Sequence, residues 1–145
     1  FTNTYRHNMD EKGRITVPAS FREELAAKGA YVTRGFEQNL MVLPVASFET
    51  IASHLLDLSI TDPQNRLLRR VILGGAERLE VDKAGRILIS QQLRNYAVLE
   101  NEVVFVGVGD HFEIWSANEY AIVNDQVENA QENAQRFIGT ELTSH

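Results

Sequence analysis

The sequence predicts an α+β fold built from two tandem copies of one small β-α-β module. A motif of the form Asp-x-x-Gly-Arg occurs at residues 10–14 and again at 82–86, an offset of 72 residues. Apolar residues and glycines keep that offset without a gap as far as Phe48 and Tyr120. Short apolar runs typical of strands alternate with helical patterns in both copies. We therefore predict a first module with linking helices over residues 1–72 and a second module with a C-terminal helix over 73–145.

The repeated motif predicts a tight turn between two strands. Gly13 and Gly85 supply the positive φ that such turns require. Asp10 and Asp82 open the turns, where a carboxylate accepts hydrogen bonds from the amides that follow. We interpret these four residues as structural.

The elements follow in the same order in each copy. Strands are predicted, copy by copy, over residues 5–9, 15–17, 30–33 and 40–43, and over 77–81, 87–89, 103–108 and 112–115. Pro18 suits the first turn of a short helix through residues 21–25, and Ser90 suits the cap of its counterpart through 93–96. Further helices are predicted over residues 48–56, from Asp62-Pro63 to Gly74-Gly75, and over 120–137.

A single copy has too little core to be stable alone. A unit of about 70 residues buries only a modest part of its surface. Two copies with their strands interleaved around a pseudo-twofold axis would form one β-core, which is a physical reason for the duplication.

Composition sets the broad class. The chain has 145 residues, of which 43% are hydrophobic and 23% charged, as in ordinary soluble domains. No apolar run approaches the ~20 residues that cross a bilayer, and the polar residues 1–9 predict no signal peptide. We therefore expect a cytoplasmic protein without a membrane partner. The absence of cysteine excludes disulfides and cysteine-based zinc sites.

Charge is unevenly distributed along the chain. The net charge is −6, yet residues 66–100 carry a net +3 and residues 101–145 a net −7. A nucleic-acid-binding protein can have this profile if its basic blocks share one face. Charge alone also fits an ordinary solvated surface.

The candidate DNA-binding residues lie in and after the two turns. Arg14 and Arg86 begin the second strands, where a guanidinium can fork onto phosphate or onto the O6/N7 edge of guanine. Lys12 and Lys83 lie in the turns, and a lysine there suits phosphate as a point charge. A two-stranded ribbon fits the major groove. The spacing equally allows each arginine to pair with its own aspartate as a purely structural contact.

Other polar residues point less clearly to function. Arg22 and Arg94 align at the same offset, and for them we favour a structural role, holding a carboxylate of another subunit, over a DNA contact. An exposed or subunit-contact face is our interpretation of Arg66, Arg69 and Arg70. The histidines 7, 54, 111 and 145 lack metal-ligand spacing, and phosphate loops and nucleophile motifs are absent. The sequence therefore predicts neither an enzyme nor a bound cofactor or metal.

The stretch Asp-Glu-Lys-Gly-Arg-Ile-Thr-Val-Pro-Ala-Ser-Phe-Arg at residues 10–22 resembles the signature of the MraZ family, and residues 82–86 resemble that family's second motif. The resemblance covers nearly the whole chain. It implies two AbrB-like swapped-hairpin modules that form a pseudo-twofold β-barrel core with flanking α-helices. Ala84 stands where the first copy has Lys12, and Ser90 where it has Pro18, so the second copy is the weaker match.

The resemblance also implies a function. MraZ-like proteins regulate transcription of the bacterial cell-division and cell-wall gene cluster. They bind repeated elements of double-stranded promoter DNA as a homo-oligomeric ring of several subunits, in the cytoplasm and associated with the nucleoid. The alternative is a protein-interaction module, antitoxin-like or a scaffold ring, whose basic turns are structural and whose acidic residues 116–145 form the binding arm.

Overall fold

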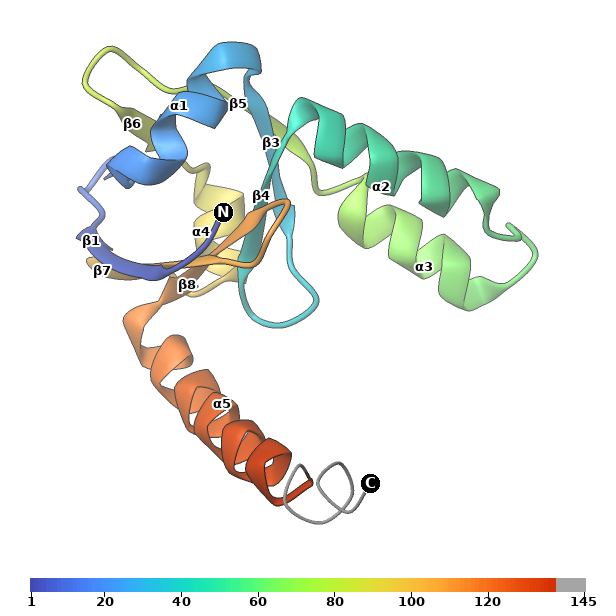
Figure 1. Cartoon of the computed structure of the whole chain (residues 1–145). Helices are drawn as coiled ribbons and strands as arrows, with labels where there is room; N and C mark the ends of the chain where they lie inside the picture. The colour runs from blue at the N-terminus through green and yellow to red at the C-terminus, as the bar shows by residue number, and fades with distance from the viewer. Residues whose placement is uncertain (138–145) are drawn as a thin grey trace.

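The two copies have the same order of elements: strand, strand, helix, strand, strand. The computed structural model describes residues 1–137 (Figure 1). The first copy contains β1 (Thr4–Asn8), β2 (Arg14–Thr16), α1 (Ala19–Lys28), β3 (Ala30–Arg34) and β4 (Leu40–Pro44). The second contains β5 (Glu77–Leu79), β6 (Arg86–Leu88), α4 (Gln91–Tyr96), β7 (Glu102–Gly107) and β8 (Phe112–Ser116). The helices that follow are α2 (Val45–Asp57) and α3 (Pro63–Ile72) after the first copy, and α5 (Ala117–Phe137) after the second.

Strands from the two copies are interleaved in one antiparallel sheet. Its order is β1-β7-β8-β4-β3-β5, while β2 and β6 form a separate two-stranded ribbon. In this sheet β1 corresponds to β5 of the other copy, β3 to β7 and β4 to β8. The order of strands is therefore symmetric about its centre: β1 pairs with β7 as β5 pairs with β3, and β4 pairs with β8 in the middle. The predicted α+β class and the predicted elements are confirmed.

The strands of the expected β-barrel core do not form a closed barrel in the part of the chain that the structure describes. The six-stranded sheet is open, with β1 and β5 as its edges. The remaining strands, β2 and β6, pair with each other across the two copies, and an isolated bridge between Met9 and Ile15 joins this ribbon to the end of β1. The swapped-hairpin description and the boundary between residues 72 and 73 stay predictions.

The main core lies between the six-stranded sheet and the ribbon. Ile15 and Ile87 face each other on the inner side of the ribbon and are buried. Phe21 of α1 stacks on Phe112 of β8, with ring centroids 4.8 Å apart, and meets Tyr5 edge-on at 5.3 Å. Both copies thus contribute to one core, as their individual sizes require.

The α2–α3 hairpin is attached to the sheet by a second apolar cluster. Met41, Leu43, Leu55 and Ile72 form its buried centre. The side chain of Asp62 caps α3 by accepting from the amide of Gln64 at 2.9 Å, as predicted.

Two of the arginines on α3 hold the end of α2 and the loop that follows it. Arg69 donates to the carbonyl oxygens of Leu55, Leu56 and Leu58 at 3.1–3.2 Å. Arg66 donates to the carbonyl of Ile60 at 2.9 Å. The sequence indicated only an exposed or subunit-contact face here, whereas Arg69 satisfies carbonyls that a helix end leaves free and Arg66 satisfies one in the loop after it.

Two further details concern helix ends and length. Pro18 occupies the cap position before α1, with φ −51° and ψ 136°, and not the first turn that we predicted. None of the helices in residues 1–137 is long and apolar enough to span a membrane.

Replacing Phe21 by alanine should destabilise the whole fold, because its ring joins elements of both copies. We expect Phe21→Ala to lower the free energy of unfolding by about 3–5 kcal/mol. Phe36→Ala is the matched control, since Phe36 is 73% exposed, and should change it by less than about 0.5 kcal/mol. Urea unfolding followed by fluorescence measures both, and equal losses would contradict this account of the core.

Candidate nucleic-acid interface

The carboxylate of Asp10 organises the first turn. Its Oδ1 accepts from the amides of Lys12 at 3.0 Å and Arg14 at 2.8 Å, and its Oδ2 accepts from Nε of Arg14 at 2.7 Å. The amide of Gly13 donates back to the carbonyl of Asp10 at 3.1 Å, and Gly13 has φ +91°. The predicted turn and the structural role of both residues agree with this geometry.

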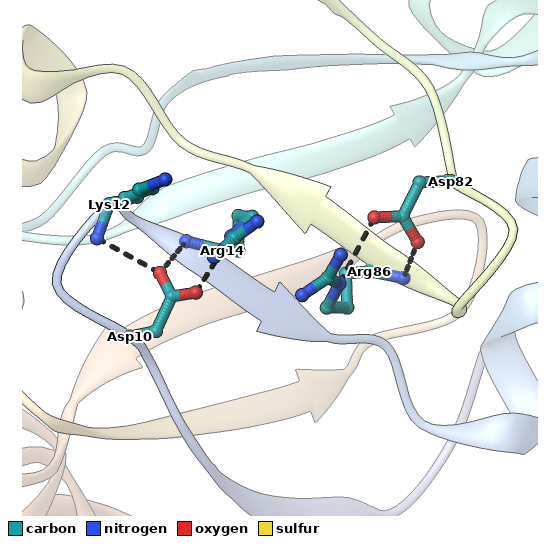
Figure 2. A network of polar contacts seen from close by, with 5 residues as sticks. All are labelled: Asp10, Lys12, Arg14, Asp82 and Arg86. Carbon is teal, nitrogen blue, oxygen red and sulfur yellow. Dashed lines mark hydrogen bonds and ion pairs between the residues drawn. The ribbon is translucent and has the colours of Figure 1, made fainter.

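The second turn repeats the first almost bond for bond. Oδ1 of Asp82 accepts from the amides of Ala84 at 2.9 Å and Arg86 at 2.8 Å, and Oδ2 accepts from Nε of Arg86 at 3.0 Å. Gly85 has φ +80°. Figure 2 shows the two aspartate–arginine pairs side by side on neighbouring strands.

Hydrogen bonds keep both aspartates ionised. The hydrogen bond from the main-chain amide of Arg14 lowers the pKa of Asp10 most. Desolvation raises the pKa in part, and the hydrogen bond from the guanidinium of Arg14 lowers it further. The amide of Arg86 lowers the pKa of Asp82 in the same way. The carboxylates are therefore charged at neutral pH and hold the arginines in place.

Each turn is also bonded to the strand of the other copy. The carbonyl of Gly13 accepts from the amide of Ile89 at 2.9 Å, and the carbonyl of Gly85 accepts from the amide of Val17 at 2.9 Å. A Cβ on Gly13 would lie 2.6 Å from the carbonyl oxygen of Ile89. Glycine is thus required both for its φ and for the close approach of the two copies.

The outward face of the ribbon carries both arginines. Arg14 lies opposite Leu88, and Arg86 lies opposite Thr16. The two arginines are therefore diagonal neighbours on one face, where such positions are about 7–8 Å apart. Thr16 is exposed and Leu88 is 60% exposed. Thr16 and Leu88 were not among the predicted site residues, although the alternation of polar and apolar residues in each strand indicates which face they share.

The arginines keep part of their hydrogen-bonding capacity free. Their side chains are 34% and 36% exposed. Each aspartate accepts a hydrogen bond from Nε, and within residues 1–137 the Nη atoms of Arg14 and Arg86 donate none. Lys12 and Lys83 are exposed in the turns beside them. The ribbon therefore presents two oriented guanidinium forks and two mobile ammonium groups.

Arg22 and Arg94 support the turns from behind. Arg22 donates to the carbonyl of Val17 at 2.9 Å, and its guanidinium lies against Gly85. Arg94 donates to the carbonyl of Ile89 at 3.0 Å and lies against Gly13. These contacts are structural, but they are made to main-chain carbonyls of the same chain and not to the carboxylate of another subunit that we expected. The offset alone did not indicate that each arginine packs against the turn of the opposite copy.

This geometry defines a class of protein in which a duplicated module presents paired basic turns on a two-stranded ribbon. A family model described as "MraZ protein, putative antitoxin-like" matches the chain twice, over residues 1–71 and 72–140. The chain belongs to the MraZ family.

Relatives of high similarity carry the same family name. Each of three is named Transcriptional regulator MraZ. The protein of Herpetosiphon aurantiacus is 43% identical over 125 residues, covering 86% of this chain and 87% of its own length. That of Finegoldia magna is 42% identical over 120 residues, 83% of each chain. That of Halothermothrix orenii is 40% identical over 132 residues, 91% of this chain and 92% of its own.

Replacing Gly13 by alanine should destabilise the protein more than replacing Gly109, another glycine of positive φ. Gly13→Ala combines a backbone cost of about 1–2 kcal/mol with a collision against Ile89 worth about 1–3 kcal/mol. Gly109→Ala is the matched control, because Gly109 has φ +106° but open space at its Cβ, and should show only the backbone cost. Thermal unfolding measures both; a Gly109→Ala loss as large as that of Gly13→Ala would contradict the close approach.

Acid should loosen the turns. The folded pKa of both aspartates lies below their unfolded value of about 3.9, so their stabilisation is complete above that pH and is lost as the pH falls through the folded pKa. The double variant Asp10→Asn/Asp82→Asn should therefore lose less free energy of unfolding than the parent between about pH 5 and about pH 2. Glu11→Gln, beside the first turn, is the control that should keep the parent's pH dependence.

Proposed function

We propose that this chain is a transcription regulator that binds double-stranded promoter DNA by placing the β2–β6 ribbon in the major groove. The observation that carries the proposal is the pair of guanidiniums on one ribbon face, each held through Nε with both Nη atoms unoccupied in the described structure. The names of the relatives support the regulatory role. No catalytic step is part of this function.

Arg14 and Arg86 read bases in this proposal, and Lys12 and Lys83 contact phosphates. The aspartate contact restricts the rotamers of each arginine before DNA arrives, so less conformational entropy is lost on binding. A guanidinium in this setting can donate two parallel hydrogen bonds to O6 and N7 of guanine. The lysines contribute position and salt dependence but not sequence preference.

The two arginines of the ribbon have different neighbours. Beside Arg14 lies the apolar Leu88, and beside Arg86 lies the hydroxyl of Thr16. An apolar side chain at the base edges suits the methyl group of thymine, whereas a hydroxyl suits either kind of base. One ribbon therefore favours an asymmetric element over a palindrome.

A single ribbon offers few cations on a chain whose net charge is −6, so one copy alone should bind weakly. In the proposed homo-oligomeric ring, several ribbons engage spaced repeats of the promoter at the same time. Such tethering raises affinity by about 10²–10⁴. We place this activity at the cell-division and cell-wall gene cluster, on the nucleoid in the cytoplasm.

A protein-interaction role is the second candidate. The specific observation in its favour is the 2.7 Å contact between Asp10 and Arg14, which satisfies part of the arginine without DNA. The antitoxin-like wording of the family description points in the same direction. In this case the turns are structural, and removing an arginine weakens the fold but not DNA binding.

Arg14→Ala should abolish most of the binding to a promoter fragment from upstream of the chain's own gene. Loss of one bidentate base contact costs about 1–3 kcal/mol, or roughly tenfold to a hundredfold in affinity. Arg6→Ala is the matched control: it removes the same charge from β1, where Arg6 pairs with Glu102 and is 59% exposed. Fluorescence anisotropy at fixed moderate salt measures affinity, and light scattering checks that both variants keep the parent's size.

The salt dependence of DNA affinity distinguishes residues that contact DNA from residues with only a structural role. The logarithm of the parent's affinity should fall by nearly one unit per unit of log salt for each phosphate neutralised. Lys12→Ala should reduce that slope with little effect on sequence preference. Normal binding by Arg14→Ala, or binding that does not change with salt, would overturn the proposed function and favour the protein-interaction role.

A further inference from the structure

Helix α5 is attached to the body of the protein only at its beginning. Oγ of Ser116 caps it by accepting from the amide of Glu119 at 3.0 Å, and the ring of Tyr120 lies edge-on to Trp115 with centroids 6.2 Å apart. The helix then runs away from the sheet (Figure 1). From residue 124 to residue 135 every side chain is exposed.

An isolated helix of this composition is poorly stabilised by itself. Asparagine is among the weaker helix formers, and α5 contains four of them, at positions 118, 124, 129 and 133. Helical segments shorter than about 12–15 residues are marginal in water without tertiary contacts. The projecting part of α5 therefore needs a partner to remain helical.

The sequence of α5 shows what kind of partner fits. Five of its apolar residues recur with alternating spacings of three and four and form a stripe that we call the α5 seam: Tyr120, Val123, Val127, Ala130 and Ala134. Ile122, which is 58% exposed, lies off this stripe. A repeat of 3.5 residues keeps such a stripe facing another helix that winds around it. Val127, in the middle of the seam, is 52% exposed. The seam is thus suited to a second helix, and its outer part, from Val127 to Ala134, is exposed in the single chain, whereas Tyr120 packs on Trp115.

The charges of α5 favour a second copy of the same helix. Asp125, Glu128 and Glu132 occupy the positions of the heptad that point away from the seam. The positions that flank the seam beyond the first turn are uncharged: Asn124, Gln126, Gln131 and Asn133. Two acidic helices can therefore meet through their seams without placing like charges against each other. A basic partner helix would find no opposite charges along these flanks.

We propose that α5 pairs with α5 of a second copy of this chain through the α5 seam, as a short two-stranded coiled coil. The small Ala130 and Ala134 permit close approach of the two helices but bury little apolar surface, so the contact is weak and reversible. It uses none of the ribbon residues, and it goes beyond the proposed function by assigning a contact surface between copies.

The absence of cysteine from the chain makes single-cysteine variants a direct test on the full-length protein. Val127→Cys places a thiol in the seam, and Asp125→Cys places one on the outer face of the same helix turn. A disulfide requires Cα atoms within about 7 Å. Each variant is oxidised mildly without DNA, and covalent dimers are detected by non-reducing electrophoresis. If the helices are parallel, Val127→Cys alone should form a dimer. If they are antiparallel, a mixture of Val127→Cys and Ala130→Cys should form one. We expect at least about tenfold more dimer than for Asp125→Cys.

A second pair of variants tests the same contact without cysteines. Val127→Glu introduces a charge into the seam and should weaken self-association by at least about tenfold in sedimentation experiments. Asn129→Glu adds the same charge off the seam and should leave it unchanged. Fluorescence of Trp115 checks that both variants keep the folded body.

The outcomes are distinct from those of the DNA experiment, which depends on Arg14 and not on α5. Equal crosslinking of Val127→Cys and Asp125→Cys, or no dimer from Val127→Cys either alone or mixed, would overturn the pairing. So would equal self-association of Val127→Glu and Asn129→Glu. In each of these cases α5 is an arm for another protein or a free helix, whatever the ribbon binds.

Discussion

The exchange of main-chain hydrogen bonds between the two turns is the constraint on which the rest of the structure depends. Gly13 accepts from Ile89, and Gly85 accepts from Val17, so each turn is completed by the opposite copy. The ribbon that results closes the core by covering its inner side with Ile15 and Ile87. Because neither half of the chain contains a complete ribbon, neither half has a complete core. Duplication is therefore a physical requirement of this fold, and the candidate functional surface lies on its axis.

The same contacts resolve the apparent conflict between a structural and a functional role for the arginines. An ion pair that engages Nε fixes the direction of a guanidinium while leaving its two Nη atoms available. The carboxylate, in turn, has its charge shared by two main-chain amides, which reduces the repulsion that it would exert on a nearby phosphate. A short aspartate–arginine distance is thus compatible with DNA binding and does not argue against it. Eight of the 20 acidic residues lie after residue 100, and four of these eight are on α5, which leaves the body of the protein (Figure 1).

Sequence patterns predicted the local features well because these depend on neighbours along the chain. The turn glycines, the aspartate bonds, the Asp62 and Ser90 caps and the strand positions all follow from spacing and side-chain chemistry over a few residues. The order of the sheet, its open edges and the packing of Arg22 against Gly85 depend on contacts between distant segments. The offset of 72 residues paired Arg22 with Arg94 but contained no information on which turn each one supports. For the same reason Arg66 and Arg69 were interpreted as a polar face, although they bind carbonyls at the end of α2 and in the loop after it.

The symmetry of the core ends where the appended helices begin, and this difference identifies the part of the chain that has no intramolecular partner. After the first copy, α2 and α3 pack on each other and on the sheet through a second apolar cluster, and arginines satisfy the helix end between them. After the second copy, α5 has no such cluster beyond its first turn in the described residues. A helix that keeps a 3.5-residue apolar repeat without burying it carries a cost in exposed apolar surface. That cost is offset only if the seam is covered by another helix, so the asymmetry between the two appendages is itself an argument that α5 acts between molecules.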